Sequence, residues 1–163
     1  RDGYDSFGVV LNTDVSTGGG IHWFCIYGDL SGNARINTTK NASSTSDDKN
    51  NKKPITLEYF NSSGFKPKEA VTFWLLNAQT AFHNAGYECK IIEATGGKQV
   101  QNSKTECGVW SLAYILSRLT DHPPDWILNV SGGIDPNNDA NEAGANGSDA
   151  DMVSFRKRLF RVS

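Results

Sequence analysis

The chain has 163 residues, of which 37% are apolar and 21% are charged, and its formal net charge is −2. This length can bury the core of one domain, the charge balance gives no general case for nucleic-acid binding, and no apolar run is long enough to span a bilayer. The chain does not begin with Met, which is typical of a fragment or a processed product.

Four segments of the chain predict β-strands. Short apolar or aromatic runs at 7–14, 21–30, 55–61 and 87–94 have the composition that strands favour. Residues 31–54 are mostly Ser, Asn, Thr, Asp and Lys, which is a composition that buries nothing. We therefore expect an exposed or disordered loop to be inserted between the second and third strands.

Helices are predicted mainly in the second half of the chain. Apolar residues recur at helical spacing over 66–86, and residues 107–119 are apolar on nearly every side, as expected of a central buried helix. A second polar loop, rich in Gly, Asn and Asp, covers 131–151. Ser148 and Asp151 form a possible capping box for a last helix.

The order strand, strand, strand, helix, strand, helix, helix predicts an α+β fold. In this fold a mixed or antiparallel sheet packs on the central buried helix. We expect residues 1–163 to form a single domain, with the loops at 31–54 and 131–151 as insertions.

One of the three cysteines occupies a position that suits a nucleophile. Cys25, Cys89 and Cys107 show no CxxC spacing, and their odd number argues against a zinc site or a disulfide framework and favours a reducing compartment. Cys107 opens the apolar helix, where free amides and the helix dipole favour a thiolate. Core packing is the commoner role of a cysteine, but the following Gly108 leaves room for a substrate backbone.

The candidate base is His22, which follows three glycines at the mouth of a predicted strand. Its imidazole could accept the thiol proton, and the alternative is a half-buried strand histidine. His83 lies on the polar face of a predicted helix and His122 in a turn, so both are weaker candidates. The adjacent Trp23 either fills the core or walls a cleft.

Two amide side chains complete the candidate site. Asn61 ends the third strand, and its oxygen could accept from one imidazole N–H and hold the tautomer, although Asn before Ser-Ser-Gly is also an ordinary turn residue. Gln101 precedes Cys107 by six residues, so its amide could donate to an oxyanion together with the Cys107 backbone N–H. The alternative is that Gln101 is a polar loop residue.

In this order, the motifs "HW", "EYFNSSG" and "Q-x5-CG" resemble the adenain and ubiquitin-like-protein protease superfamily of cysteine peptidases. The resemblance implies a papain-like, adenain-type core whose central helix bears the nucleophile. It implies a triad of His22, Asn61 and Cys107, with Gln101 as the oxyanion donor. Many members have Asp where this chain has Asn61, and a neutral amide would stabilise an imidazolium less than a carboxylate would.

The resemblance also implies cleavage after Gly-Gly, because only residues without a Cβ pass a channel that is walled by Trp23 and opened by Gly108. Relatives from large DNA viruses process structural polyproteins, so we expect a viral endopeptidase that acts as a monomer, without a cofactor, in the host cytoplasm and the virion. The resemblance also implies an N-terminal region, which we expect to be missing from this sequence. A deconjugating isopeptidase for ubiquitin-like modifiers and an inactive module that binds Gly-Gly tails are the alternatives.

Overall fold

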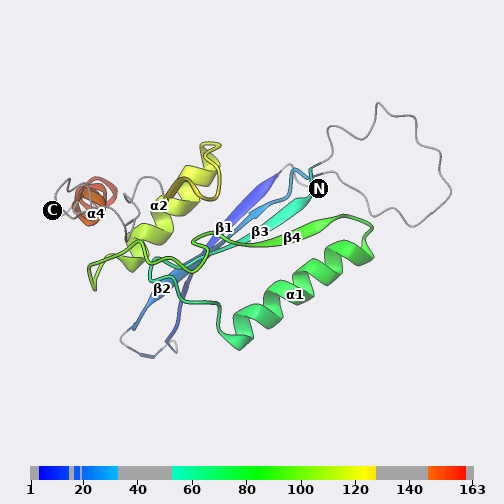
Figure 1. Cartoon of the computed structure of the whole chain (residues 1–163), viewed down its shortest axis with the longest axis horizontal. Helices are drawn as coiled ribbons and strands as arrows, with labels where there is room; N and C mark the ends of the chain where they lie inside the picture. The colour runs from blue at the N-terminus through cyan, green and yellow to red at the C-terminus, as the bar shows by residue number, and fades with distance from the viewer. Residues whose placement is uncertain (1–3, 15–16, 19, 33–52, 128–146, 161–163) are drawn as a thin grey trace, which may run out of the picture.

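The computed structural model describes residues 4–14, 17–18, 20–32, 53–127 and 147–160. Within these ranges the chain forms four strands and three helices (Figure 1). In chain order they are β1 (Ser6–Asn12), β2 (Trp23–Asp29), β3 (Ile55–Phe60), α1 (Glu69–Asn84), β4 (Cys89–Glu93), α2 (Cys107–Leu119) and α4 (Gly147–Leu159). Each predicted strand and helix is present. The ends of the four strands and of the first two helices differ from the predicted ends by at most three residues.

The four strands form one mixed sheet in the order β1-β2-β3-β4. β1 and β3 both pair antiparallel with β2, and Ile26 of β2 lies opposite Val9 on one side and Tyr59 on the other. β3 and β4 pair in parallel, because α1 connects them and carries the chain back to the starting edge. The α+β class predicted from the sequence is confirmed.

Alternate side chains of β2 point to opposite faces of the sheet, and both faces are covered. Cys25 and Tyr27 belong to the apolar cluster that contains the buried residues of α2. Phe24 and Ile26 belong to a second cluster, which packs against α1. Because both faces of β2 are buried, its sequence has no alternation of apolar and polar residues.

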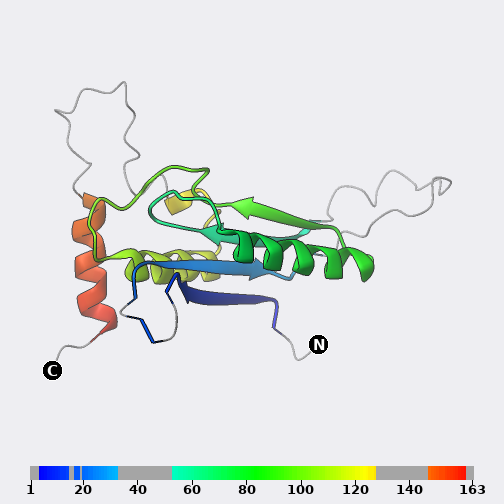
Figure 2. The same cartoon turned by 90° about the horizontal axis from the view of Figure 1, so that it is seen from below.

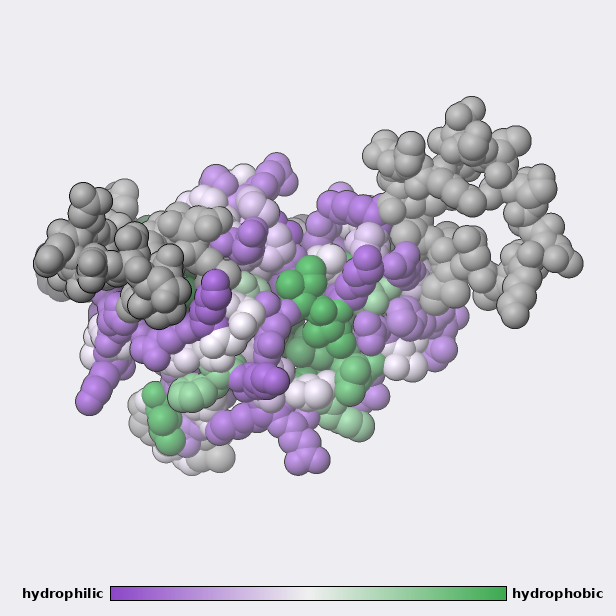
Figure 3. All heavy atoms as spheres, in the orientation of Figure 1, coloured by the Kyte–Doolittle hydropathy of each residue, from purple (hydrophilic) through white to green (hydrophobic). Residues whose placement is uncertain are grey.

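The buried stripe of α1 is narrower than its sequence predicts. Val71, Leu75, Ala78 and Phe82 pack on the sheet, whereas Trp74, predicted for the same face, is 47% exposed. A helix lying on a sheet buries only the side chains along its line of contact. Other large apolar side chains of α1 are exposed as well, and Figure 3 shows an apolar patch over this helix: Phe73 and Leu76.

The face of α2 toward the sheet is fully buried, and Tyr114 stacks on Phe60 with ring centroids 4.5 Å apart. Trp110, one turn nearer the start of the helix, is also fully buried. Leu116 and Leu119 are exposed. The expectation that this helix is buried on nearly every side is therefore wrong for its last turns, because the sheet covers only one of its faces.

Helix α4 runs across the end of the molecule where α2 begins (Figure 2). Met152 of α4 is buried in the α2 cluster, and Phe155 packs against that cluster. This crossing places the first turn of α4 beside the segment that leads into α2. None of the helices in the described ranges has the length and apolar character that crossing a membrane requires.

Most of the two predicted loops, 31–54 and 131–151, lies outside the described residues. The second loop is shorter than predicted, because α4 already begins at Gly147. The capping box proposed for Ser148 and Asp151 concerns side chains outside the described part of the chain, so it stays a prediction.

Candidate active site

A histidine and an asparagine meet where two neighbouring strands end. His22 precedes β2 and Asn61 follows β3, and the antiparallel pairing of Cys25 with Phe60 brings these ends together. Nε2 of His22 lies 2.7 Å from Oδ1 of Asn61. The backbone N–H of Ser63 also donates to that Oδ1, at 3.0 Å, which identifies the atom as the amide oxygen. Nε2 of His22 is therefore the donor in this bond.

The Asn61 side chain is buried, and its nitrogen is fixed as well. Nδ2 of Asn61 donates to the hydroxyl of Tyr59 at 3.0 Å. Burial raises the pKa of Tyr59, so this phenol stays protonated at neutral pH. Asn61 thus closes a turn, through Ser63, and contacts His22 at the same time.

Helix α2 begins at Cys107, as predicted. The cysteine is free and only 6% exposed. Trp23 lies beside the next residue, since a methyl group placed on Gly108 would be 3.7 Å from the indole ring, which is ordinary van der Waals contact. Because His22 and Cys107 are the chain neighbours of these two residues, the contact brings the two predicted catalytic segments side by side.

Gln101 is held by Ser62, the residue after Asn61. The backbone carbonyl of Ser62 accepts from the N–H groups of Val100 and Gln101, at 2.9 and 3.0 Å. Its hydroxyl donates to Oε1 of Gln101 at 2.6 Å, and Nε2 of Gln101 donates to the carbonyl of Ser103 at 2.6 Å. Gln101 is 4% exposed, so it is not a solvated loop residue. The same Nε2 carries a second N–H, for which the described part of the chain supplies no hydrogen-bond partner.

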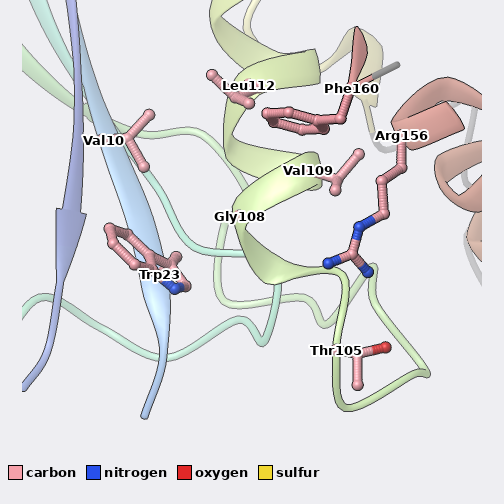
Figure 4. Close-up of a pocket in the computed structure, with 8 residues that line it drawn as sticks. All are labelled: Val10, Trp23, Thr105, Gly108, Val109, Leu112, Arg156 and Phe160. Carbon is pink, nitrogen blue, oxygen red and sulfur yellow. The ribbon is translucent and has the colours of Figure 1, made fainter. Parts of the chain in front are cut away.

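Two cavities open on either side of the His22–Trp23 pair. One, of about 420 Å³, is lined by His22 and Asn61 together with residues that lead into α1. The other, of about 530 Å³, is lined by Trp23 and by side chains of α2 and α4 (Figure 4). His22 lines only the first of these cavities and Trp23 only the second. A peptide lying across the pair could reach both.

Sequence reasoning missed Ser62 and also an acidic residue of α4. Asp149 accepts three hydrogen bonds from the segment around Gln101 and Cys107: from the backbone N–H groups of Asn102 and Ser103 and from the indole of Trp110. In the sequence it stands between Ser148 and Asp151, the residues of the predicted capping box, and nothing there marks Asp149 itself. Its partners lie 39 to 47 positions earlier in the chain, and no local sequence pattern indicates a contact over that separation.

The remaining histidines and cysteines do not join this site. His83 is exposed and its Nε2 lies 3.3 Å from a backbone oxygen, while His122 stacks on Trp126. Burial raises the pKa of the thiols of Cys25 and Cys89, so both are poor nucleophiles. Across the described ranges, His, Cys, Asp and Glu side chains nowhere gather in threes that could bind a metal ion.

Comparison with known proteins relates this chain to viral cysteine proteases. No protein-family model matches the chain. The SUMO-1 cysteine protease S273R of an African swine fever virus warthog isolate from Namibia is 33% identical over 159 residues, which is 98% of this chain. The cysteine protease S273R of the Badajoz strain matches to the same extent.

The crystal structure of the African swine fever virus pS273R protease superposes with a TM-score of 0.66, at 29% identity over 98% of this chain. The chain is therefore similar to this viral protease along almost the whole of its own length and has the same fold. It spans 45% of the length of these relatives.

Proposed function

We propose that this chain is the catalytic part of a viral cysteine endopeptidase that cleaves structural polyproteins after Gly-Gly. The observation that carries the proposal is the 2.7 Å contact between His22 and Asn61, made beside the helix that begins at Cys107. Its relatives are named cysteine proteases. A polyprotein substrate places the enzyme at assembly sites in the host cytoplasm and in the virion, where it acts as a monomer.

Catalysis begins with a proton transfer from Cys107 to His22. Because Nε2 of His22 is the donor to Asn61, the lone pair of the neutral ring lies on Nδ1, which is the atom that accepts the thiol proton. The thiolate attacks the glycyl carbonyl carbon, and Nδ1–H then protonates the leaving amine. A water molecule that His22 deprotonates hydrolyses the thioester and releases Cys107.

The oxyanion of each tetrahedral intermediate is held by two N–H groups. One is the backbone N–H of Cys107, which has no partner within its own helix because it lies in the first turn. The other is the second N–H of Gln101 Nε2, whose first N–H binds Ser103. Such donors typically contribute about 10²- to 10³-fold each to the rate.

Specificity for glycine follows from the narrow space beside the nucleophile. Trp23 and Gly108 approach so closely that one added methyl group would fill the gap to van der Waals contact. A substrate residue that passes this point has little room for a side chain, which favours Gly-Gly before the scissile bond. The larger cavity beyond, which also contains Leu112, then receives a bulkier part of the substrate (Figure 4).

Removal of a ubiquitin-like modifier is the second candidate function, because curated relatives are named SUMO-1 cysteine protease. The chemistry at Cys107 is the same in both cases. The two functions differ in the leaving amine, which is a backbone α-amine in a polyprotein and a lysine ε-amine in a conjugate.

The test is a peptide panel that varies the residues around Gly-Gly, with matched isopeptide-linked substrates, and products read by mass spectrometry. We expect the wild-type chain to cut linear peptides after Gly-Gly faster than it cuts isopeptides, and Cys107→Ala to cut neither. Faster cleavage of isopeptides would establish the deconjugating function instead. Binding of Gly-Gly peptides without any cleavage would refute both.

A further inference from the structure

A single carboxylate of α4 binds the segment that carries the proposed oxyanion donor and nucleophile. Oδ2 of Asp149 accepts from the backbone N–H groups of Asn102 at 2.9 Å and Ser103 at 2.7 Å, and Oδ1 accepts from Nε1 of Trp110 at 3.1 Å. These three donors lie within the segment from Gln101 to the first turn of α2. The indole is fully buried, so its N–H requires an acceptor within the protein.

Ser103 links Asp149 directly to Gln101. Its backbone N–H binds Asp149, and its backbone carbonyl accepts from Nε2 of Gln101 at 2.6 Å. The other end of the Gln101 amide, Oε1, is held by Ser62. Each end of this amide is therefore fixed by one serine, and the position of the serine on the nitrogen side depends on α4.

We propose that Asp149 is a positioning residue that acts through Ser103 to aim the free N–H of Gln101 at the oxyanion. This inference rests on the proposed protease function. A charge-assisted bond of this kind is shorter and stronger than a neutral one, which suits a group that must be held in one orientation.

A second contact from the same helix supports a role of α4 in holding this segment. Arg156 lies seven residues after Asp149, which places it on the same face two turns later. Its Nη1 donates to Oε1 of Glu106, the residue before Cys107, at 3.0 Å. The Arg156 side chain is 52% exposed, so this ion pair is the weaker of the two contacts. Asp149 is therefore the residue to test.

The first measurement compares steady-state kinetics of Asp149→Ala, Asp149→Asn and the wild-type chain on a cleaved Gly-Gly peptide. We expect Asp149→Ala to lower kcat by roughly 10- to 100-fold with little change in KM. Asp149→Asn keeps one acceptor oxygen and should fall in between. Asp125→Ala removes an exposed aspartate elsewhere and is the matched control, expected to match the wild type.

The double variant with Gln101→Ala separates positioning from general destabilisation. If Asp149 acts through Gln101, adding Asp149→Ala to Gln101→Ala changes kcat by less than about threefold, because the group that it positions is already gone. If the two losses multiply instead, Asp149 acts by another route and the inference is wrong. Should Asp149→Ala fold poorly, the same cycle is run with Asp149→Asn.

Alkylation by iodoacetamide reports on the fold and the nucleophile, because this reaction forms no oxyanion. We expect unchanged alkylation of Cys107 in Asp149→Ala, with the buried Cys25 and Cys89 still protected. A wild-type kcat in Asp149→Ala would overturn this inference alone. A wild-type chain that cleaves no Gly-Gly substrate would overturn the proposed function and the inference with it.

Discussion

The two ends of α2 differ in whether the buried polar atoms around them all have hydrogen-bond partners. Near its C-terminal end, the carboxylate of the fully buried Glu58 accepts from the hydroxyls of Thr56 and Tyr114 and from Nε and Nη2 of Arg118, at 2.7 to 3.0 Å. Arg118 also donates to the carbonyl of His122. This network satisfies its carboxylate completely, as a structural ion pair must if it is to be tolerated in a core.

Near the N-terminal end of α2, polar atoms are buried without partners. Among the described residues, Oγ of Ser103 and Oε2 of Glu106 are buried and form no hydrogen bond. Both residues lie in the segment between Gln101 and Cys107, which also contributes Thr105 to the lining of the cavity of about 530 Å³. Unsatisfied polar groups are costly in a core. This difference is the one expected if one end of the helix stabilises the fold and the other serves the proposed chemistry.

The largest expected effect is on activity, at the N-terminal end. His22→Ala removes the proposed base and should lower kcat/KM on the order of 10⁶-fold. Asn61→Ala leaves the base in place without its partner and should leave measurable turnover, with a loss of about 10²- to 10⁴-fold. His22→Ala should unfold in urea within about 1 kcal/mol of the wild type, whereas Asn61→Ala also leaves the Ser63 N–H and the Tyr59 hydroxyl without their partner and should lose about 1–3 kcal/mol. Equal activity of Asn61→Ala and the wild type would remove Asn61 from the site.

The next effect is on stability, at the C-terminal end. Arg118→Met leaves Glu58 buried without its counter-charge, which should lower the free energy of unfolding by about 3–5 kcal/mol. Position 118 lies eleven residues, or roughly 16 Å, along the helix from Cys107. We therefore expect kcat of the folded variant to stay near that of the wild type. Lys157→Met, at an exposed site on α4, is the control.

A stable Arg118→Met variant would show that the Glu58 network does not stabilise the fold. A folded variant with a greatly reduced kcat would show that the two ends of α2 are coupled, and the comparison between them would fail.

A substitution at Gly64 tests whether the position of Gln101, the proposed oxyanion donor, affects the rate. The φ of Gly64 is 72°, and a methyl group there would lie 2.7 Å from the carbonyl carbon of Lys98 and 2.8 Å from the backbone nitrogen of Gln99. Gly64→Ala should therefore cost about 1–3 kcal/mol of stability and lower kcat roughly tenfold by displacing Gln101. Gly96→Ala has the same backbone strain but open space around it.

Both glycine variants should therefore lose stability, but only Gly64→Ala should lose activity. Gly96→Ala should lose stability through strain alone and keep its kcat. If both glycine variants keep full kcat, then the seating of Gln101 does not depend on this loop contact.

The smallest effect is the dependence of stability on alkaline pH. Burial raises the pKa of Tyr59, the hydrogen-bond partner of Asn61, and also that of Tyr114, where the Glu58 charge adds to the effect. The folded chain keeps these protons after the unfolded chain has lost them, so the stabilisation is complete below about pH 10 and falls above it by about 1.4 kcal/mol per pH unit per tyrosine. Urea unfolding of the wild type and of Tyr114→Phe between pH 8 and 11 checks this, since the variant should have a smaller slope.

The sequence predicts the elements of this fold better than the contacts between them. Strand composition and helical spacing depend on neighbouring residues, so all four strands and the start of α2 at Cys107 could be predicted. The pairing of His22 with Asn61 was indicated by the resemblance of the motifs to a protease superfamily, because no local pattern relates residues 39 positions apart.

Contacts between distant segments account for what the sequence did not predict. Asp149 binds donors 39 to 47 positions earlier in the chain, and Arg118 pairs with a glutamate 60 positions earlier. Glu58 lies on a strand where a charged residue normally faces solvent, and only its partners make burial tolerable. The exposure of Trp74 depends likewise on how α1 lies on the sheet.

The most direct test of this account labels the chain with a peptide that ends in Gly-Gly bearing a vinyl methyl ester, followed by peptide mapping. We predict a single adduct on Cys107, which is lost in His22→Ala and absent when the penultimate glycine of the probe is replaced by leucine. Adducts on Cys25 or Cys89 at a similar rate, or an adduct on Cys107 that does not depend on His22, would contradict the assignment of an activated nucleophile to the start of α2.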